Sequence, residues 1–127
     1  MRYVVFHGNE RSSLNSVSLI GNLATDVDLK ELDGERRVAN FVLAVGRAGR
    51  DGADFVRVAA WNRQAELCER YLAKGLQIGV DGRLRSRTWE DGEGRRQTAL
   101  EVVANHVDFL FATSRRTEAA TTEAAVA

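Results

Sequence analysis

One stretch of the sequence decides the fold: LQIGVDGRLRSRTWE, residues 76–90. Apolar or small side chains recur at every second position of this stretch. That is the spacing of a β-strand, in which successive side chains point to opposite faces. The turn-forming residues Asp91-Gly92-Glu93-Gly94 follow, and a second β-rich run covers residues 95–110. The sequence therefore predicts a long β-hairpin in the C-terminal half of the chain.

Shorter β-rich runs lie on the N-terminal side of this hairpin. They cover residues 16–23, with a continuation after a bend into 27–32, then 38–45 and 54–61. The chain contains no proline, and Asp33-Gly34 and Asp51-Gly52 mark the turns between these runs. We therefore expect three strands, the first of them bent, before the hairpin.

A helix is predicted between the third of these strands and the hairpin, over residues 63–74, with Gly75 ending it. Its apolar side carries Ala65, Cys68 and Leu72, with Leu67 and Tyr71 beside them. Three strands, one helix and two more strands is the element order of the OB-fold, a five-stranded Greek-key barrel. We therefore predict an all-β fold with one helix between strands three and four and a long hairpin between strands four and five.

The length and composition fit one domain of this kind. With 127 residues, 44% of them hydrophobic, the chain can fill one small barrel but has no room for a second folded domain. We expect the barrel over residues 15–111, preceded by an N-terminal extension over residues 1–14. Residues 112–127 are rich in Ala, Thr and Glu, and we expect them to form a disordered C-terminal tail.

Charge and cysteine content narrow the function classes. Basic and acidic residues both number 18, so a nucleic-acid partner has to be argued from where the charges lie. The single cysteine, Cys68, excludes an internal disulfide and a cysteine-based metal cluster, and it fits a reducing compartment. No run approaches the roughly 20 apolar residues of a membrane span. We expect a soluble, cytoplasmic protein without a membrane partner.

The third predicted strand places aromatic and basic residues on one face. Val56, Val58 and Ala60 suit the core, while Phe55, Arg57 and Trp61 have the opposite parity. Large aromatic side chains are costly to leave in water unless a ligand covers them. Single-stranded nucleic acid would cover them, because each base offers a π-face and each phosphate offers a charge.

The fourth strand repeats this pattern and adds charge. Arg83, Arg85, Arg87 and Trp89 share one parity, and Arg95 and Arg96 follow on the other arm of the hairpin. Residues 83–96 hold five arginines against three acids, whereas residues 26–35 hold five acids against Lys30. Charge is thus segregated in a neutral chain, as a local electrostatic groove requires. We predict that these residues and those of the third strand bind single-stranded nucleic acid without reading its sequence.

Other interpretations remain open at this point. One alternative is that Phe55 and Trp61 are buried in the core and that the arginines only make a strand face soluble. Another OB module, such as a primosome component, an RNA-binding barrel or a protein-interaction barrel, would share the fold.

A catalytic function has less support in the sequence. His7, His106 and Cys68 form no pattern of nucleophile, base and orienting group, and Asp26, Asp28 and Glu31 read as a solvated acidic turn rather than a cation site. We therefore expect no enzymatic activity, no catalytic residue, no metal and no cofactor.

From about Asn15 to Leu110 the chain resembles the bacterial single-stranded DNA-binding proteins. The segments that carry the resemblance are Asn15-Ser16-Val17, Leu19-Ile20-Gly21-Asn22-Leu23, Val38-Ala39-Asn40-Phe41, Asp54-Phe55-Val56-Arg57-Val58, Tyr71-Leu72-Ala73-Lys74-Gly75, Asp81-Gly82-Arg83-Leu84-Arg85-Ser86-Arg87-Thr88-Trp89 and Glu101-Val102-Val103-Ala104. The resemblance implies stacking of bases on Phe55, Trp61 and Trp89, with basic contacts from Arg57, Arg85 and Arg87. It also implies a homotetramer that acts in DNA replication, recombination or repair, on the nucleoid when bound to DNA.

Two positions depart from that family. Many members carry a further aromatic residue that would fall near Gly49, but Arg47-Ala48-Gly49-Arg50 contains none. Members usually end in an acidic tip with an aromatic residue that recruits replication and repair enzymes. The only acidic residues in 117–127 are Glu118 and Glu123, and this segment contains no aromatic residue. The chain therefore resembles a short paralogue, and we expect no recruitment of enzymes through the C-terminal tip.

Overall fold

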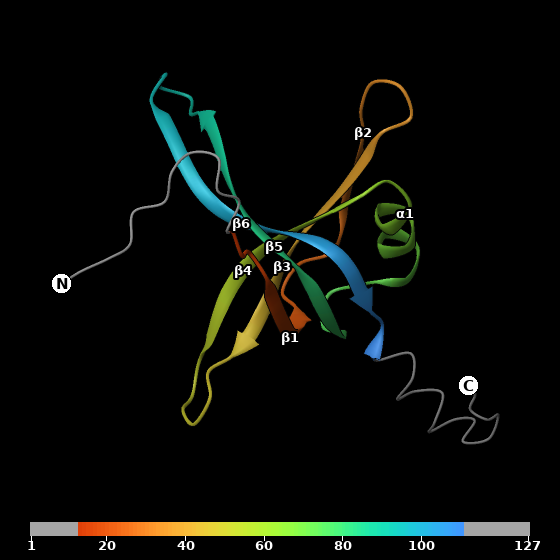
Figure 1. The fold of residues 1–127 in the computed structure, drawn as a ribbon, viewed down its shortest axis with the longest axis vertical. Coiled ribbons are helices and arrows are strands. Elements are labelled where there is room, and N and C mark those ends of the chain that lie inside the picture. The colour runs from red at the N-terminus through yellow and green to blue at the C-terminus, as the bar shows by residue number, and fades with distance from the viewer. Residues whose placement is uncertain (1–12, 111–127) are drawn as a thin grey trace.

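The structure is a computed structural model, and it describes residues 13–110 (Figure 1). Its elements in chain order are β1 (Val17–Leu23), β2 (Asp28–Glu31), β3 (Arg37–Gly46), β4 (Ala53–Trp61), α1 (Asn62–Tyr71), β5 (Gln77–Glu90) and β6 (Arg96–Asp108). The predicted order of strands and helix is confirmed. The bend expected after residue 23 divides the first predicted strand into β1 and β2, so the helix lies between β4 and β5.

The strands close into a barrel. Their order is β1-β5-β6-β4-β3-β2, and β1 also pairs with β3 through Asn22 with Ala44 and Leu23 with Leu43. This second pairing requires a close approach at Gly21, because a Cβ atom there would lie 2.4 Å from the Ala44 carbonyl oxygen. The predicted OB-type barrel is confirmed, and the absence of a side chain at Gly21 is part of its closure.

The core lies inside the barrel and under the helix. Leu23, Phe41 and Leu43 fill it from the N-terminal strands, and Ile78 and Val102 fill it from the hairpin. Because core side chains occur at every second position of each strand, the alternate side chains point outward. These outward rows provide the surfaces available for a ligand.

The helix is shorter than predicted at its C-terminal end. Ala65, Cys68 and Leu72 are buried, as the spacing predicted. However, α1 ends at Tyr71 rather than Lys74, because Leu72 already has an extended backbone and caps the helix with its N–H on the Cys68 carbonyl. Gly75, with φ at 95°, therefore belongs to the following turn and does not itself end the helix.

Three hairpin arms extend from the barrel (Figure 1). The β5–β6 arm, in blue and green, and the orange β2–β3 arm rise on one side, and the yellow-green β3–β4 arm points the other way. The turn glycines Gly34, Gly52 and Gly94 all have positive φ, in agreement with the predicted turns. The arms carry most of the outward rows described below.

A β-bulge lies at the base of the β5–β6 arm. The register shifts between Asp81 and Gly82, and Asn105 on β6 is left without a partner on β5. A Cβ atom at Gly82 would lie 2.1 Å from the Val103 carbonyl oxygen, so the two backbones touch where a side chain would stand. Beyond the bulge the arm begins with Arg83, the first of the outward arginines.

Candidate nucleic-acid interface

The outward row of β4 carries the two aromatic side chains that the alternation placed there. Phe55 is 68% exposed and Arg57 is exposed, while Trp61 is half-buried at the end of the strand. The alternate residues Val58 and Ala60 are buried in the core. The interpretation that Phe55 and Trp61 belong to the core is therefore wrong. They are six positions apart along an extended strand, a distance of roughly 20 Å.

The row on β4 and the row on β5 belong to one continuous face. Ala59 of β4 pairs with Val103 of β6, and Val103 lies opposite Arg83 of β5. Directly paired residues in neighbouring strands share a face. Ala59 and Val103 are buried although they point outward, so they form the apolar floor between the two rows.

The outward row of β5 follows the predicted parity. Its members and their partners on β6 are Arg83 with Val103, Arg85 with Glu101, Arg87 with Ala99 and Trp89 with Gln97. The side chains of β5 beyond the bulge are exposed. Arg83 is additionally within hydrogen-bonding distance of the Asn105 side-chain oxygen, at 3.4 Å. The structure thus brings the sequence-predicted residues of two separate strands together on a single surface.

Two guanidinium groups lie close to the Trp61 ring. The Arg85 guanidinium carbon is 5.9 Å from the ring centroid and that of Arg36 is 6.0 Å away. Both distances are within the range of cation–π interactions. Sequence reasoning did not find Arg36, which lies in the connection between β2 and β3. It approaches Trp61 because β3 places Val38 directly opposite the tryptophan.

Trp89 has a basic partner of its own at the end of the hairpin. The Arg87 guanidinium lies 5.5 Å from its ring centroid, and the tryptophan is exposed. The structure therefore pairs each tryptophan of the face with arginine, which keeps its ring at the surface in a defined environment.

The remaining two predicted arginines, Arg95 and Arg96, lie apart from this row. Arg95 forms ion pairs with Glu93 at 2.9 Å and with Asp91 at 3.7 Å inside the turn. Arg96 lies opposite Glu90 in the strand register, and its side chain is on the other face of the hairpin from Trp89 and Gln97. Arg83, Arg85 and Arg87 thus form the row, whereas Arg95 and Arg96 flank the tip of the hairpin.

Two adjoining hollows follow the face where β4, β5 and β6 meet the β2–β3 arm. Their volumes are about 350 Å³ and about 180 Å³, and both are lined by Asn40, Arg87 and Glu101. The larger also includes Arg57 and the smaller includes Lys30, Trp61 and Arg85. Asp26 and Asp28 form an acidic wall of the larger one. The hollows thus form a groove that brings Arg57 and Trp61 of the β4 row together with Arg85 and Arg87 of the β5 row.

Glu101 is the residue that sequence reasoning missed most clearly. Its exposed fraction is only 4%, although it points outward from β6 into both hollows. Its Oε2 atom accepts a hydrogen bond of 2.5 Å from Nη2 of Arg85. A buried carboxylate needs such a partner, because an unpaired buried charge is strongly destabilising. No local sequence pattern distinguishes Glu101 from an exposed strand residue.

The groups considered for catalysis or metal binding are dispersed. Burial raises the pKa of Cys68 to about 11, so its thiol is neutral at physiological pH. His106 is exposed and pairs with Asp108 at 2.8 Å. Within residues 13–110, no group of three or more His, Cys, Asp or Glu side chains is placed to hold a metal ion. Asp26 instead accepts a hydrogen bond from the Lys74 backbone N–H.

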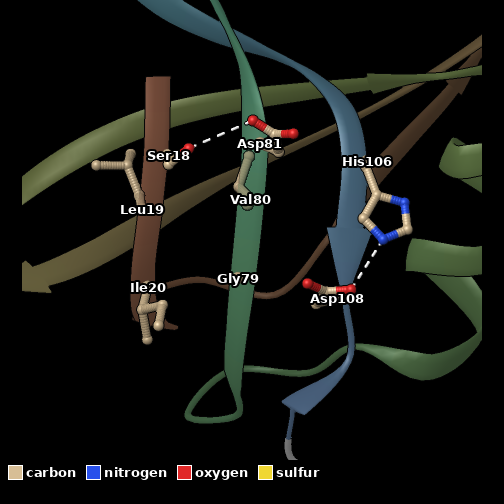
Figure 2. Close-up of a pocket in the computed structure, with 8 residues that line it drawn as sticks. All are labelled: Ser18, Leu19, Ile20, Gly79, Val80, Asp81, His106 and Asp108. Carbon is tan, nitrogen blue, oxygen red and sulfur yellow. Dashed lines mark hydrogen bonds and ion pairs between the residues drawn. The ribbon is translucent and has the colours of Figure 1, made fainter. Parts of the chain in front are cut away.

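A larger hollow of about 560 Å³ lies elsewhere, on the outer face of β1, β5 and the end of β6 (Figure 2). Ile20, which is 59% exposed, lies on its β1 side, and His106 and Asp108 lie on its β6 side. Asp81 lies between them on β5 and accepts a hydrogen bond from Ser18. The acidic groups of this hollow are Asp81 and Asp108, and its lining includes neither an arginine nor a phenylalanine, tyrosine or tryptophan ring. These groups do not suit a polyanion, so size does not identify the candidate interface here.

Several sequence-based expectations fall outside the described residues. They concern His7, most of the N-terminal extension and the whole of the tail over residues 112–127. Among residues 13–110, no helix has the length and apolar composition needed to cross a membrane.

Comparison with known proteins gives a consistent result. The model of the family described as "Single-strand binding protein family" matches residues 14–110. The single-stranded DNA-binding protein of Halalkalibacterium halodurans is 43% identical over 102 residues, 76% of this chain and 61% of that protein. That of Clostridium tetani is 43% identical over 76% of this chain and 70% of its own length. Single-stranded DNA-binding protein 2 of Listeria monocytogenes is 40% identical over 85% of this chain and 71% of its own length. The chain spans less than two thirds of the Halalkalibacterium relative.

Proposed function

Because the chain belongs to the single-strand binding protein family, we propose that it binds and protects single-stranded DNA without sequence specificity. The observation that carries the proposal is the continuous face on which Phe55, Trp61 and Trp89 lie with outward arginines of β4 and β5. The names of the relatives, which are single-stranded DNA-binding proteins, support the same conclusion. We assign the protein a binding role in replication, recombination or repair, in the cytoplasm and on the nucleoid when DNA is bound.

The chemistry of the face suits this ligand. Stacking of a base on an aromatic side chain contributes about 1 to 3 kcal/mol and tolerates every base, because each base has a π-face. Arginine contributes phosphate pairing and can itself stack. A single strand exposes its bases, whereas a duplex hides them in the stack. The chain has no net charge, so the local arrangement of arginines supplies the attraction for the backbone.

Intrinsic fluorescence provides a direct test, since Trp61 and Trp89 are the only tryptophans in the chain. We expect oligo-dT to quench most of the emission, a duplex of equal length to leave it nearly unchanged, and added salt to weaken the binding. Trp89→Phe separates the signals of the two rings. A matched oligo-U titration distinguishes a preference for DNA from general single-strand binding. Unchanged emission at saturating oligo-dT would rule out stacking on these rings.

We also propose that the protein assembles into a homotetramer. Residues 17–21 of β1 pair with β5 on one side only, because the β1–β3 pairing begins at Asn22. An open strand edge offers unpaired N–H and C=O groups to a second copy of the chain. The exposed Ile20 beside this edge would be covered by such an association. The DNA would then pass over several copies of the aromatic and arginine face.

A further inference from the structure

The proposed DNA-binding face contains one buried carboxylate, that of Glu101, although DNA is a polyanion. Glu101 is the only charged residue among residues 13–110 that is buried, and it lies between the hollows that follow the proposed DNA path. Uncompensated, it would repel phosphate at that point. Its compensation comes from Arg85, at 2.5 Å. The ion pair of Arg85 and Glu101 therefore has no net charge, so Arg85 adds little positive charge to the face.

Arg85 makes two contacts at once. Nη2 donates to Glu101, and the guanidinium carbon lies 5.9 Å from the centroid of the Trp61 ring. The guanidinium group is rigid and planar, so a strong hydrogen bond to one side restricts where the rest of it can lie. The Glu101 carboxylate thus holds Arg85 against Trp61 before any DNA arrives, and pre-organisation of this kind lowers the entropic cost of binding.

The other two arginines on the groove lack such a partner. Among the residues that the structure describes, no carboxylate forms an ion pair with Arg57 or with Arg87. Both line the larger hollow, and Arg87 lines the smaller one as well. Their charges are available to phosphate, whereas that of Arg85 is already neutralised.

We propose that Glu101 is a positioning residue that holds the Arg85 guanidinium against the Trp61 ring, on which a base stacks. Phosphate groups are then paired by Arg57 and Arg87 and not by Arg85. This inference rests on the proposed function and refines it. It departs from the expectation that Arg57, Arg85 and Arg87 all make the same kind of basic contact.

The salt dependence of binding separates the two kinds of arginine. Plotted against log[NaCl], log Kobs falls, and each phosphate neutralised by a cation adds about 0.7 to the steepness of that fall for a single strand. Slope here means this steepness. We expect Arg87→Ala to reduce the slope for oligo-dT by about that amount. The double variant Arg85→Ala/Glu101→Gln removes the whole pair without changing the net charge. It should leave the slope unchanged and weaken binding about two- to fivefold at every salt concentration, as loss of an exposed cation–π contact would.

Glu101→Gln alone tests the positioning role. It frees the charge of Arg85 for phosphate, so the slope should increase by up to about 0.7 over that of the wild type. A merely structural role of Glu101 would change affinity or stability but not the slope. Circular dichroism and thermal unfolding establish that each variant is folded, and if Glu101→Gln alone is unfolded, the comparison of Arg87→Ala with the double variant decides.

Each outcome has a clear meaning. If the double variant reduces the slope as much as Arg87→Ala does, Arg85 pairs with phosphate and the inference is overturned. An unchanged slope in a folded Glu101→Gln protein would also overturn it. Failure of the wild-type protein to bind oligo-dT at any salt concentration would instead contradict the proposed function itself, so the two failures are distinguishable.

Discussion

At the scale of single residues, the face combines rings and guanidinium groups that lie over one another. Trp61 faces Arg85 and Arg36, and Trp89 faces Arg87. In the proposed complex these arginines flank the bases that stack on the rings. The rings differ in their second role, because Trp61 is half-buried against the barrel whereas Trp89 lies on an arm that contributes little to the core.

The exposed position of Trp89 leads to a mutational prediction. Trp89→Ala should weaken binding of oligo-dT by about 1 to 3 kcal/mol, the value of one stacked base, and should leave thermal stability nearly unchanged. Leu100→Ala is the matched control, since Leu100 is an exposed apolar residue of the same hairpin that pairs with Ser86 on the opposite face. Fluorescence anisotropy of labelled DNA measures both. Wild-type affinity of Trp89→Ala would assign this ring a purely structural role.

Cys68 carries a prediction about reactivity. Burial raises its pKa to about 11, and only the thiolate reacts readily with disulfide reagents. In the folded protein at mildly alkaline pH, Ellman's reagent should therefore react with Cys68 far more slowly than with the unfolded chain. Because the folded pKa is raised, the stability contributed by the neutral thiol is present below the ordinary value of about 8.5 and is lost as pH rises toward the folded value. Equal rates in the folded and unfolded protein would contradict this.

At the scale of elements, the β5–β6 hairpin carries the arginine row, and the bulge at its base requires a glycine. Gly82→Ala should lower the free energy of unfolding by about 1 to 3 kcal/mol, since the new Cβ meets the Val103 backbone. Gly92→Ala is the control, because nothing lies within 4 Å of a Cβ at that position in the same hairpin. Urea unfolding measures both, and equal midpoints would mean that the bulge accommodates a side chain.

The tip of this hairpin carries a pH prediction. Backbone N–H groups of Arg95 and Glu93 donate to Asp91 at 2.9 and 2.8 Å and, with the Gln97 side chain, lower the pKa of the Asp91 carboxyl. The stabilisation of the turn is therefore complete above the ordinary aspartate value of about 3.9, and it is lost as the pH falls through the lowered pKa. An NMR titration of the carboxyl carbon should show a midpoint below that of free aspartate. A midpoint at or above it would contradict the hydrogen-bonded turn.

The elements also show where sequence patterns were sufficient. Alternation predicted the outward row of β4 and that of β5, and aspartate with glycine marked the turns. The end of α1 differs from the prediction by three residues, because the chain becomes extended at Leu72 and does not continue as a helix to Gly75. Packing of Leu72 into the core outweighed its helical propensity.

At the scale of the whole molecule, the proposed tetramer depends on the free edge of β1. Ile20→Lys places a charge beside that edge and should shift the protein toward smaller species, because buried charges destabilise an interface. Light scattering coupled to gel filtration measures the mass. Leu84→Lys is the control, at an exposed apolar residue of β5 beyond the segment that pairs with β1. A wild-type protein that is monomeric at high concentration would contradict the assembly.

The sequence by itself determined the barrel class, the identity of the strands and the two separate rows of aromatic and basic residues. These features follow from local properties, since a period of two and turn-forming residues are readable without knowing which strands are neighbours. The tertiary structure alone decided that the two rows form one face. It did so through the pairing of Ala59 with Val103 and of Val103 with Arg83. It also decided that Arg36 reaches Trp61 and that Glu101 is buried beside Arg85. Such neighbours come from segments far apart along the chain, and only the strand order and register of a closed barrel bring them into contact.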